Sequence, residues 1–181
     1  MNFTLNSKDY MDYIVAVNQE LNEKEEYITN LDLATGDGDH WANLHMGFTK
    51  LTEEKERLEA LDLSSELKEI GKIMMAVIGG SSGVLYGSAY LHASKVMKDK
   101  EAIHKEELFE ILNAMLNAIM ERGQAKPGFK TMIDSLHPAV EEYKAALEEG
   151  ASVEELCKRV AAAAEKGAEE TRNMESIKGR A

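Results

Sequence analysis

The sequence predicts an all-α protein, because helix-forming residues dominate it and neither strand alternation nor hairpin turns recur. Long stretches are rich in Glu, Lys, Ala, Leu and Met, and the only prolines are Pro127 and Pro138. Apolar residues make up 44% of the 181 residues, enough for one compact domain with a single core over residues 1–181. We expect about eight antiparallel helices joined by short loops, in a bundle or closed helical barrel.

Apolar periodicity and capping residues place these helices along the chain. The first begins near Ser7, with Asp9 favouring its start. Gly79 and Gly80 break the chain between the fourth and fifth helices. The expected helices run, in order, through 7–21, 24–30, 40–51, from after Ser65 to the break at Gly79, 82–97, 104–122, 130–147 and 152–177.

The charge balance excludes two classes of partner. A net charge of -12 and a pI near 4.9 argue against nucleic acid or an anionic membrane surface, since both would repel the chain. Any anionic ligand must then be bridged by cations. The single cysteine, Cys157, excludes an internal disulfide framework and is expected to be a buried small hydrophobe. With no leader and no long apolar run, we expect a soluble cytoplasmic protein.

One loop concentrates acidic residues beside glycines. Residues 32–43 read DLATGDGDHWAN, with Asp32, Asp37 and Asp39 as the carboxylates. Such clustered carboxylates repel one another, whereas hard divalent cations need clustered oxygen ligands. The helix that follows would present free amide hydrogens and a partial positive charge to phosphate oxygens. The pattern favours a magnesium-phosphate site. The alternative is a capped surface turn whose aspartates satisfy amides.

Two more glycine-broken helix starts follow, GGSSG at 79–83 and RGQAKPGFKTM at 122–132. In a helical bundle these two loops and the acidic loop can meet at one end. The small residues and hydroxyls of GGSSG allow close backbone approach to a phosphate. The turn lacks the lysine and the strand of a Walker P-loop, so its alternative interpretation is a simple connector.

Taken together, four segments carry a family resemblance: GDGDH followed by Asn43, then GGSSGVLYGSAYL, then RGQAKPGFKTM, then KGRA at the chain end. In this order they resemble the dihydroxyacetone kinase L subunit family, over Asp32 to Ala181. The resemblance implies an antiparallel eight-helix barrel, with the nucleotide site at one rim and two Mg²⁺ ions.

The resemblance also implies a set of site residues. The metal ligands would be Asp32, Asp37 and Asp39. The residues matching the family's nucleotide contacts are His40, Trp41, Ala42, Asn43, Ser81, Ser82, Gly123, Met132 and Arg180. No catalytic residue is assigned beyond the metal site. His40 is a candidate base, but so by residue type are His45, His92, His104 and His137.

The implied reaction is phosphoryl transfer with ADP or ATP as coenzyme. In the bacterial form of the family, bound ADP is recharged by a phosphohistidine carrier, the M subunit of the phosphotransferase system. The phosphoryl group then passes to dihydroxyacetone held on a separate K subunit. A free-standing chain resembles this arrangement more than the fused ATP-dependent kinase, and it allows a homodimer.

Three departures from the family pattern leave alternatives open. Phe129 stands where the family has an aspartate, Trp41 replaces a small residue, and the chain stops at Ala181, where the family continues into a tail over the nucleotide. These changes suit a paralogous subunit acting on another small hydroxyketone or sugar. They also suit a nucleotide-bound regulatory interaction module without turnover.

Overall fold

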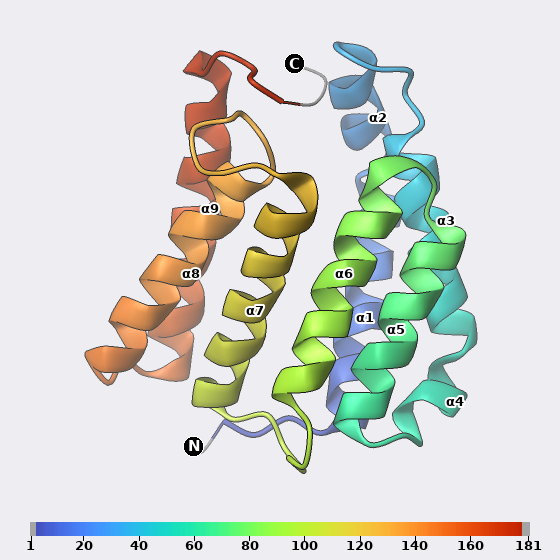
Figure 1. The fold of residues 1–181 in the computed structure, drawn as a ribbon, viewed down its shortest axis with the longest axis vertical. Helices are drawn as coiled ribbons and strands as arrows, with labels where there is room; N and C mark the ends of the chain where they lie inside the picture. Colours follow the sequence, from blue (N-terminus) through green and yellow to red (C-terminus); the bar gives the residue numbers. More distant parts are fainter. Residues whose placement is uncertain (1–2, 179–181) are drawn as a thin grey trace.

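The fold is that of a computed structural model in which residues 3–178 are described. Figure 1 shows that these residues form helices joined by loops. The helices are α1 (Ser7–Glu23), α2 (Glu25–Leu33), α3 (His40–Glu53), α4 (Lys55–Glu59), α5 (Leu63–Val77), α6 (Gly80–Val96), α7 (Lys105–Gly123), α8 (Ile133–Glu148), α9 (Val153–Glu170) and a 3-10 turn, η1 (Thr171–Asn173). The all-α class is confirmed.

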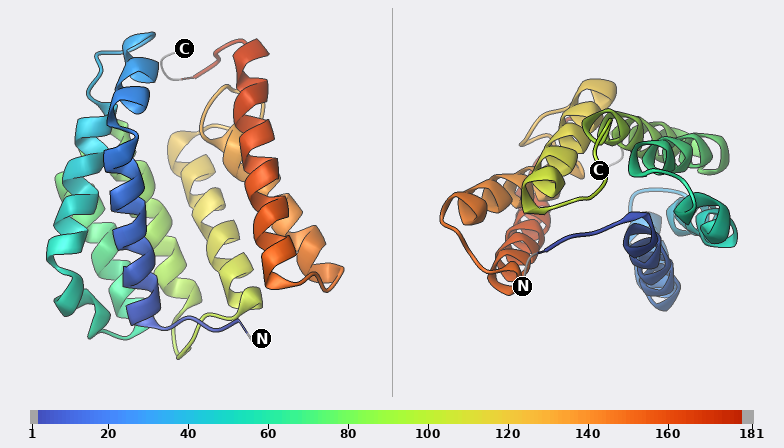
Figure 2. Two further views of the ribbon diagram at one scale, coloured as in Figure 1. Left: turned by 180° about the vertical axis from the view of Figure 1, so that it is seen from behind. Right: turned by 90° about the horizontal axis from the view of Figure 1, so that it is seen from below.

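The long helices run up and down the molecule and pack in chain order (Figures 1 and 2). Helix α3 packs between α1 and α5, and α6, α7, α8 and α9 follow one another around the molecule. Closure into a barrel stays a prediction, because α1 and α9 do not form a packed pair in the described residues. The N-terminal segment instead crosses to the start of α7, where Leu5 and Ile103 exchange two main-chain hydrogen bonds of 2.9 Å.

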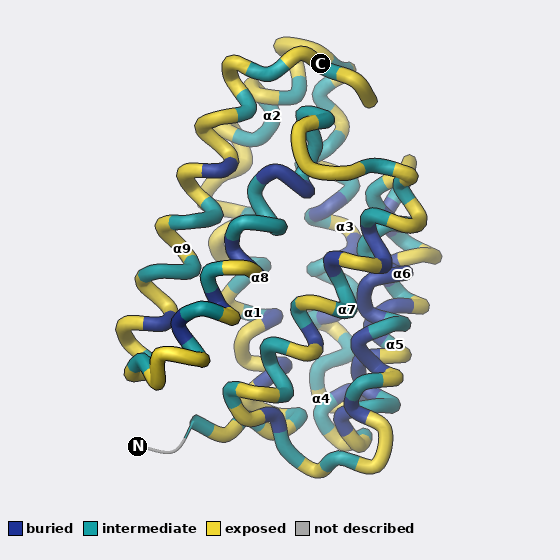
Figure 3. Tube along the Cα trace, turned by 60° about the vertical axis from the view of Figure 1, so that its left-hand side comes forward, coloured by how far each residue is buried: buried dark blue, intermediate teal, exposed yellow. Residues whose placement is uncertain are grey.

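The core lies between the long helices, and α2 contributes no fully buried residue to it (Figure 3). Side chains of α1, α3, α5 and α6 form the largest cluster, in which Ile14, Leu51 and Met74 are completely buried. Two smaller clusters join α6 to α7 and α8, and α7 to α8 and α9. Because α2 has no buried residue, its side chains and those of the loops beside it are accessible to a ligand at this end of the molecule.

Helices α5 and α6 cross closely because two glycines face each other. A Cβ atom at Gly87 would lie 2.8 Å from the carbonyl oxygen of Gly71, and a Cβ at Gly71 would lie 2.9 Å from the Gly87 carbonyl oxygen. Both contacts involve backbone, which cannot rotate away. The crossing therefore holds the start of α6 in a fixed position relative to α5.

Replacing Gly87 by alanine should destabilise the protein by roughly 1–3 kcal/mol, because the added methyl group overpacks this crossing. Helix propensity alone favours alanine over glycine and would stabilise the protein by about 1 kcal/mol. The packing effect and the propensity effect therefore have opposite signs. Urea unfolding measures the difference, with Asn117→Ala on the exposed face of α7 as the control. An unfolding free energy equal to or above the wild-type value would contradict the packing argument.

Several helix boundaries differ from those expected. The short helix α4 was not predicted, since five residues show too little periodicity. Helix α5 starts at Leu63, three residues earlier than expected, where the Asp62 side chain caps it by accepting the Ser65 N–H. Helix α8 starts at Ile133 rather than at 130, because Lys130 has a φ of 56°, which is incompatible with a helix. Helix α9 ends at Glu170 rather than at 177, and the chain continues through η1.

The expected burial of Cys157 is wrong. Helix α9 buries a narrow stripe that includes Leu156 and Gly167, and Cys157 lies one position beside that stripe, where it is exposed. Adjacent residues on a helix differ by about 100° in direction, so an apolar neighbour does not imply burial. Within residues 3–178, no helix is both long enough and apolar enough to cross a bilayer.

Candidate functional site

The acidic loop forms a tight reversal between α2 and α3. At the end of α2, the Asp32 carbonyl oxygen accepts the N–H groups of Thr35 and Gly36 at 3.0 and 2.5 Å. Gly38 has a φ of 75°, and a Cβ there would lie 2.7 Å from the Leu33 side chain. Glycine is required at this turn for both reasons. The chain then enters α3 directly, with Asp39 at its N-cap position.

The three aspartates converge in this loop. One carboxylate oxygen from each of Asp32, Asp37 and Asp39 lies within 4.8 Å of the others, with Asp32 half-buried and the other two exposed. Asp32 Oδ2 also accepts the His40 N–H at 3.2 Å, whereas Asp39 makes no side-chain capping bond. A purely structural turn would use the N-cap aspartate as a cap. The arrangement instead leaves the Asp39 carboxylate available to a divalent cation, and this donor set fits Mg²⁺.

The start of α6 faces the start of α3. Gly79 is extended, Gly80 has a φ of 65°, and no side chain caps the helix. The Asn43 side chain of α3 packs directly against Gly79, since a Cβ at Gly79 would lie 2.5 Å from Asn43 Oδ1. The uncapped amides of α6 and the hydroxyl of Ser81 therefore open toward the acidic loop, as expected for a phosphate-binding helix terminus.

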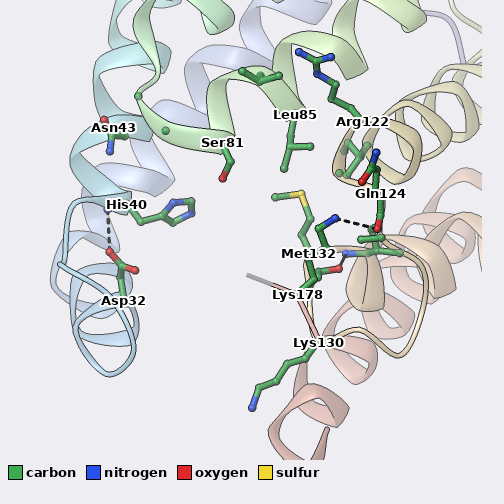
Figure 4. A pocket seen from close by; sticks show the side chains of 18 of the residues that line it. Asp32, His40, Asn43, Ser81, Leu85, Arg122, Gln124, Lys130, Met132 and Lys178 are labelled. Atoms are coloured by element: carbon green, nitrogen blue, oxygen red, sulfur yellow. Dashed lines mark hydrogen bonds between the residues drawn. The ribbon is translucent and has the colours of Figure 1, made fainter. Parts of the chain in front are cut away.

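A cavity of about 870 Å³ lies between these loops, the end of α7 and the loop before α8 (Figure 4). Its polar side is formed by the acidic loop, Asn43 and Ser81, and its apolar side by Val84, Leu85, Ile119 and Met132. The volume suits a nucleotide-sized ligand. An apolar ring fits between the aliphatic side chains, and an anionic group fits beside the helix termini and the carboxylates.

The cavity also contains three cationic side chains, Arg122, Lys130 and Lys178. The Lys178 ammonium donates to the Gln124 carbonyl oxygen at 3.3 Å. The cavity thus places cations opposite the carboxylates. Such a charge distribution favours a ligand that bears both bound cations and negative charge of its own.

Many of the residues predicted from the sequence meet at this cavity. It is lined by Asp32, Asp39, His40, Asn43, Ser81, Gly123 and Met132, and Asp37 joins the carboxylate cluster at its edge. Arg180 lies outside the described residues. Among the histidines, His40 lines this cavity, whereas the main-chain N–H of His104 donates to the Glu107 carboxylate at the start of α7 and the His45 ring stacks on an indole.

The side chain of Trp41 points away from the cavity. Its indole Nε1–H donates to the Leu21 carbonyl oxygen at 2.9 Å, and its ring stacks on His45 with centroids 4.8 Å apart. The indole therefore ties α3 to the end of α1 and does not crowd the phosphate side. Trp41, Ala42 and Ser82 are absent from the cavity lining. Their predicted nucleotide contacts would have to use the main chain of the two helix starts.

Phe129 also lies outside the cavity lining. Its carbonyl oxygen accepts the Ile177 N–H at 3.3 Å, and the Lys126 ammonium lies 5.5 Å from its ring centroid. This position thus ties the C-terminal segment to the loop before α8. The segment brings Lys178 to the cavity.

Sequence reasoning missed the apolar wall and the cations. Val84, Leu85 and Ile119 look like ordinary core positions of α6 and α7, and no local pattern separates a cavity wall from a core. Arg122, Gln124 and Lys130 stand within or beside the motif RGQAKPGFKTM, which was the one available signal. Their place in the cavity depends on how that loop folds.

Comparison with known proteins assigns the chain to a family. The sequence profile of the DAK2 domain family matches residues 34–181. The ADP-binding subunit DhaL of the PEP-dependent dihydroxyacetone kinase from Escherichia coli K12 is 33% identical over 158 residues, which are 87% of this chain and 75% of that protein. The corresponding subunit of kinase 1 from Listeria innocua is 36% identical over 163 residues, 90% of this chain and 76% of the relative.

A solved structure shows the same fold. The dihydroxyacetone kinase from C. freundii, determined in complex with AMP-PNP and Mg²⁺, superimposes with a TM-score of 0.72 and 27% sequence identity. The match covers 92% of this chain and 29% of the kinase chain. The chain therefore belongs to the DAK2 domain family, together with the DhaL subunits of dihydroxyacetone kinases.

Proposed function

We propose that this chain is the nucleotide-binding subunit of a PEP-dependent dihydroxyacetone kinase. It binds ADP or ATP with two Mg²⁺ ions and transfers a phosphoryl group to dihydroxyacetone held on a separate K subunit. A phosphohistidine carrier of the phosphotransferase system then recharges the bound ADP. The observation that carries this proposal is the convergence of three carboxylates at the edge of a nucleotide-sized cavity.

Each part of the cavity has a role in this proposal. Asp32, Asp37 and Asp39 hold the Mg²⁺ ions, which neutralise phosphate charge as the phosphoryl group moves. The amides at the start of α6 and the Ser81 hydroxyl bind phosphate oxygens. The aliphatic wall around Leu85 holds the base and excludes water from it.

The same arrangement explains why no nucleophilic side chain is needed. Phosphoryl transfer depends mainly on positioning and on electrostatic stabilisation of the moving group, and little covalent help from the protein is required. Asp32 contributes to positioning, because its bond to the His40 N–H couples the acidic loop to the start of α3. The similarity of this chain to ADP-binding DhaL subunits, and the AMP-PNP and Mg²⁺ in the C. freundii complex, support the proposal.

Mass spectrometry of small molecules released from the denatured protein tests the coenzyme role. Protein purified without added nucleotide should release close to one ADP per chain, because a coenzyme that is recharged in place has no need to dissociate. A subsequent assay should form dihydroxyacetone phosphate only with a K subunit from the same organism, the phosphorylated carrier and catalytic amounts of ADP. If neither ADP nor ATP binds the wild-type chain in the presence of Mg²⁺, the proposed function is wrong.

A further inference from the structure

The loop between α7 and α8 holds a lysine in an unusual conformation. Lys130 has a φ of 56°, and Gly128, two residues earlier, has a φ of 89°. Glycine adopts left-handed backbone conformations freely, but a lysine does so only at a cost. Such a conformation persists where the surrounding structure holds it, and it is found most often at ligand sites.

A buried carboxylate holds this loop. Asp134, in the first turn of α8, is 5% exposed. Its Oδ1 accepts the Gly128 N–H at 2.5 Å and its Oδ2 accepts the Thr131 N–H at 2.8 Å. These two bonds lie on either side of Lys130 in the chain, so they fix the backbone through that residue.

The last long helix supports the same aspartate. A Cβ at Gly167 in α9 would lie 2.2 Å from the Asp134 carbonyl oxygen, so the α9 backbone packs directly against this turn of α8. Asp134 itself is absent from the cavity lining. It therefore acts on the cavity through the loop that it holds.

Among the described residues, the Lys130 ammonium has no ion-pair partner that would explain its position. It lines the cavity, and no carboxylate of residues 3–178 lies within 4.0 Å of it. Figure 4 shows its side chain extending away from Ser81 and Leu85, with Asp32 on the other side of the cavity. Its charge is therefore available to an anion held between Lys130 and the acidic loop.

We propose that Lys130 binds the phosphate end of the nucleotide and that Asp134 is the residue that positions it. This proposal rests on the proposed nucleotide-binding function. Metal ions on the aspartates neutralise phosphate oxygens from one wall, and the ammonium supplies a charge-assisted hydrogen bond from the other. The bonds from Asp134 to Gly128 and Thr131 hold the backbone from which the Lys130 side chain extends.

Binding titrations with two ligands separate this role from a structural one. Mg·ADP and adenosine share the base and ribose, and only the first carries phosphate. The variants are Lys130→Asn, which keeps a residue tolerant of the left-handed region, Asp134→Asn and the double substitution. Lys126→Asn is the control, because it removes a cation from the same loop but outside the cavity lining.

Lys130→Asn should weaken Mg·ADP binding by about tenfold and leave adenosine binding unchanged, since one charge-assisted bond is lost. Asp134→Asn should weaken Mg·ADP binding to a similar extent. In the Lys130→Asn background, Asp134→Asn should add less than about a twofold effect, because both substitutions remove the same contact. Lys126→Asn should bind both ligands as the wild type does.

Three results would overturn the proposal. They are unchanged Mg·ADP binding by Lys130→Asn, equal losses for adenosine and Mg·ADP, and full additivity of the two substitutions. Circular dichroism checks that each variant is folded, and Asp134→Glu replaces Asp134→Asn if the latter is unfolded. A wild-type chain that binds neither ligand contradicts the proposed function itself, which distinguishes that failure from a failure confined to Lys130.

Discussion

Replacing Asp37 and Asp39 together by alanine should abolish the stabilisation of the protein by Mg·ADP. At a ligand concentration one hundred times the Kd, binding stabilises a folded protein by about 2.7 kcal/mol. For a chain of this size, that corresponds to a rise in melting temperature of roughly 5–10 °C. The variant should show no rise, because in the proposed function Mg²⁺ ions link the phosphates to the protein, and Asp32 alone cannot hold them.

The ligand-free variant should melt close to the wild-type temperature, because Asp37 and Asp39 are exposed side chains of a surface loop. Differential scanning fluorimetry with and without Mg·ADP measures both effects. The matched control is Glu25→Ala with Glu26→Ala, which removes two exposed charges from α2 without touching the cluster. A ligand-induced shift of wild-type size in the aspartate variant would refute the metal assignment.

Substituting Glu66 by glutamine should stabilise the protein at neutral pH. The Glu66 side chain is completely buried in α5, and neither of its carboxylate oxygens has a hydrogen-bond partner among the described residues. Burial raises the pKa of Glu66 to about 8, with a smaller contribution from the charges of Glu59 and Asp62, while the one hydroxyl proton of nearby Ser7 is donated to the Leu61 carbonyl oxygen and not to this carboxylate. The folded protein therefore keeps a proton that the unfolded chain loses above its ordinary pKa of 4.5.

The sign of the pH dependence follows from this difference. Because the folded state binds the extra proton between about pH 4.5 and about pH 8, stability falls as the pH rises through that window. The loss at pH 7 is roughly 3 kcal/mol. Glutamine cannot ionise, so the variant should match the wild type near pH 4 and exceed it increasingly toward pH 8.

Urea unfolding at several pH values measures this slope. Glu69→Gln on the same helix is the control: its pKa is lowered by the hydrogen bond to Lys72, so its removal should change stability little and with the opposite sign. A wild-type protein whose stability does not fall between pH 5 and pH 8, relative to the Glu66→Gln variant, would show that Glu66 is ionised in the fold.

The convergence of the three carboxylates could be predicted from local sequence, because they lie in one short loop, and their role as metal ligands stays a proposal. Asp32, Asp37 and Asp39 converge because the chain turns sharply at Gly38, which has a positive φ, and then enters α3. The break at Gly79 and Gly80 was equally visible, since glycine pairs interrupt a helix wherever they occur. Short-range patterns of this kind report backbone geometry directly.

Other features could not be predicted, because they depend on contacts between distant segments. The indole of Trp41 points to Leu21 rather than to a ligand, and only the packing of α1 against α3 decides that direction. Cys157 is exposed because the packing of α8 against α9 selects which stripe of α9 is buried. The five-residue helix α4 is too short for its periodicity to be recognised.

By itself, the sequence determined the all-α class, the cluster of three carboxylates and the glycine-broken helix starts, because each depends on residues close together in the chain. The tertiary structure alone decided which loops form one cavity, and it placed Leu85, Ile119 and Lys130 in its walls. The physical reason is that a cavity is enclosed by elements far apart in sequence. Their relative positions follow from helix packing, such as the Gly71 and Gly87 crossing, and not from the pattern of any one segment.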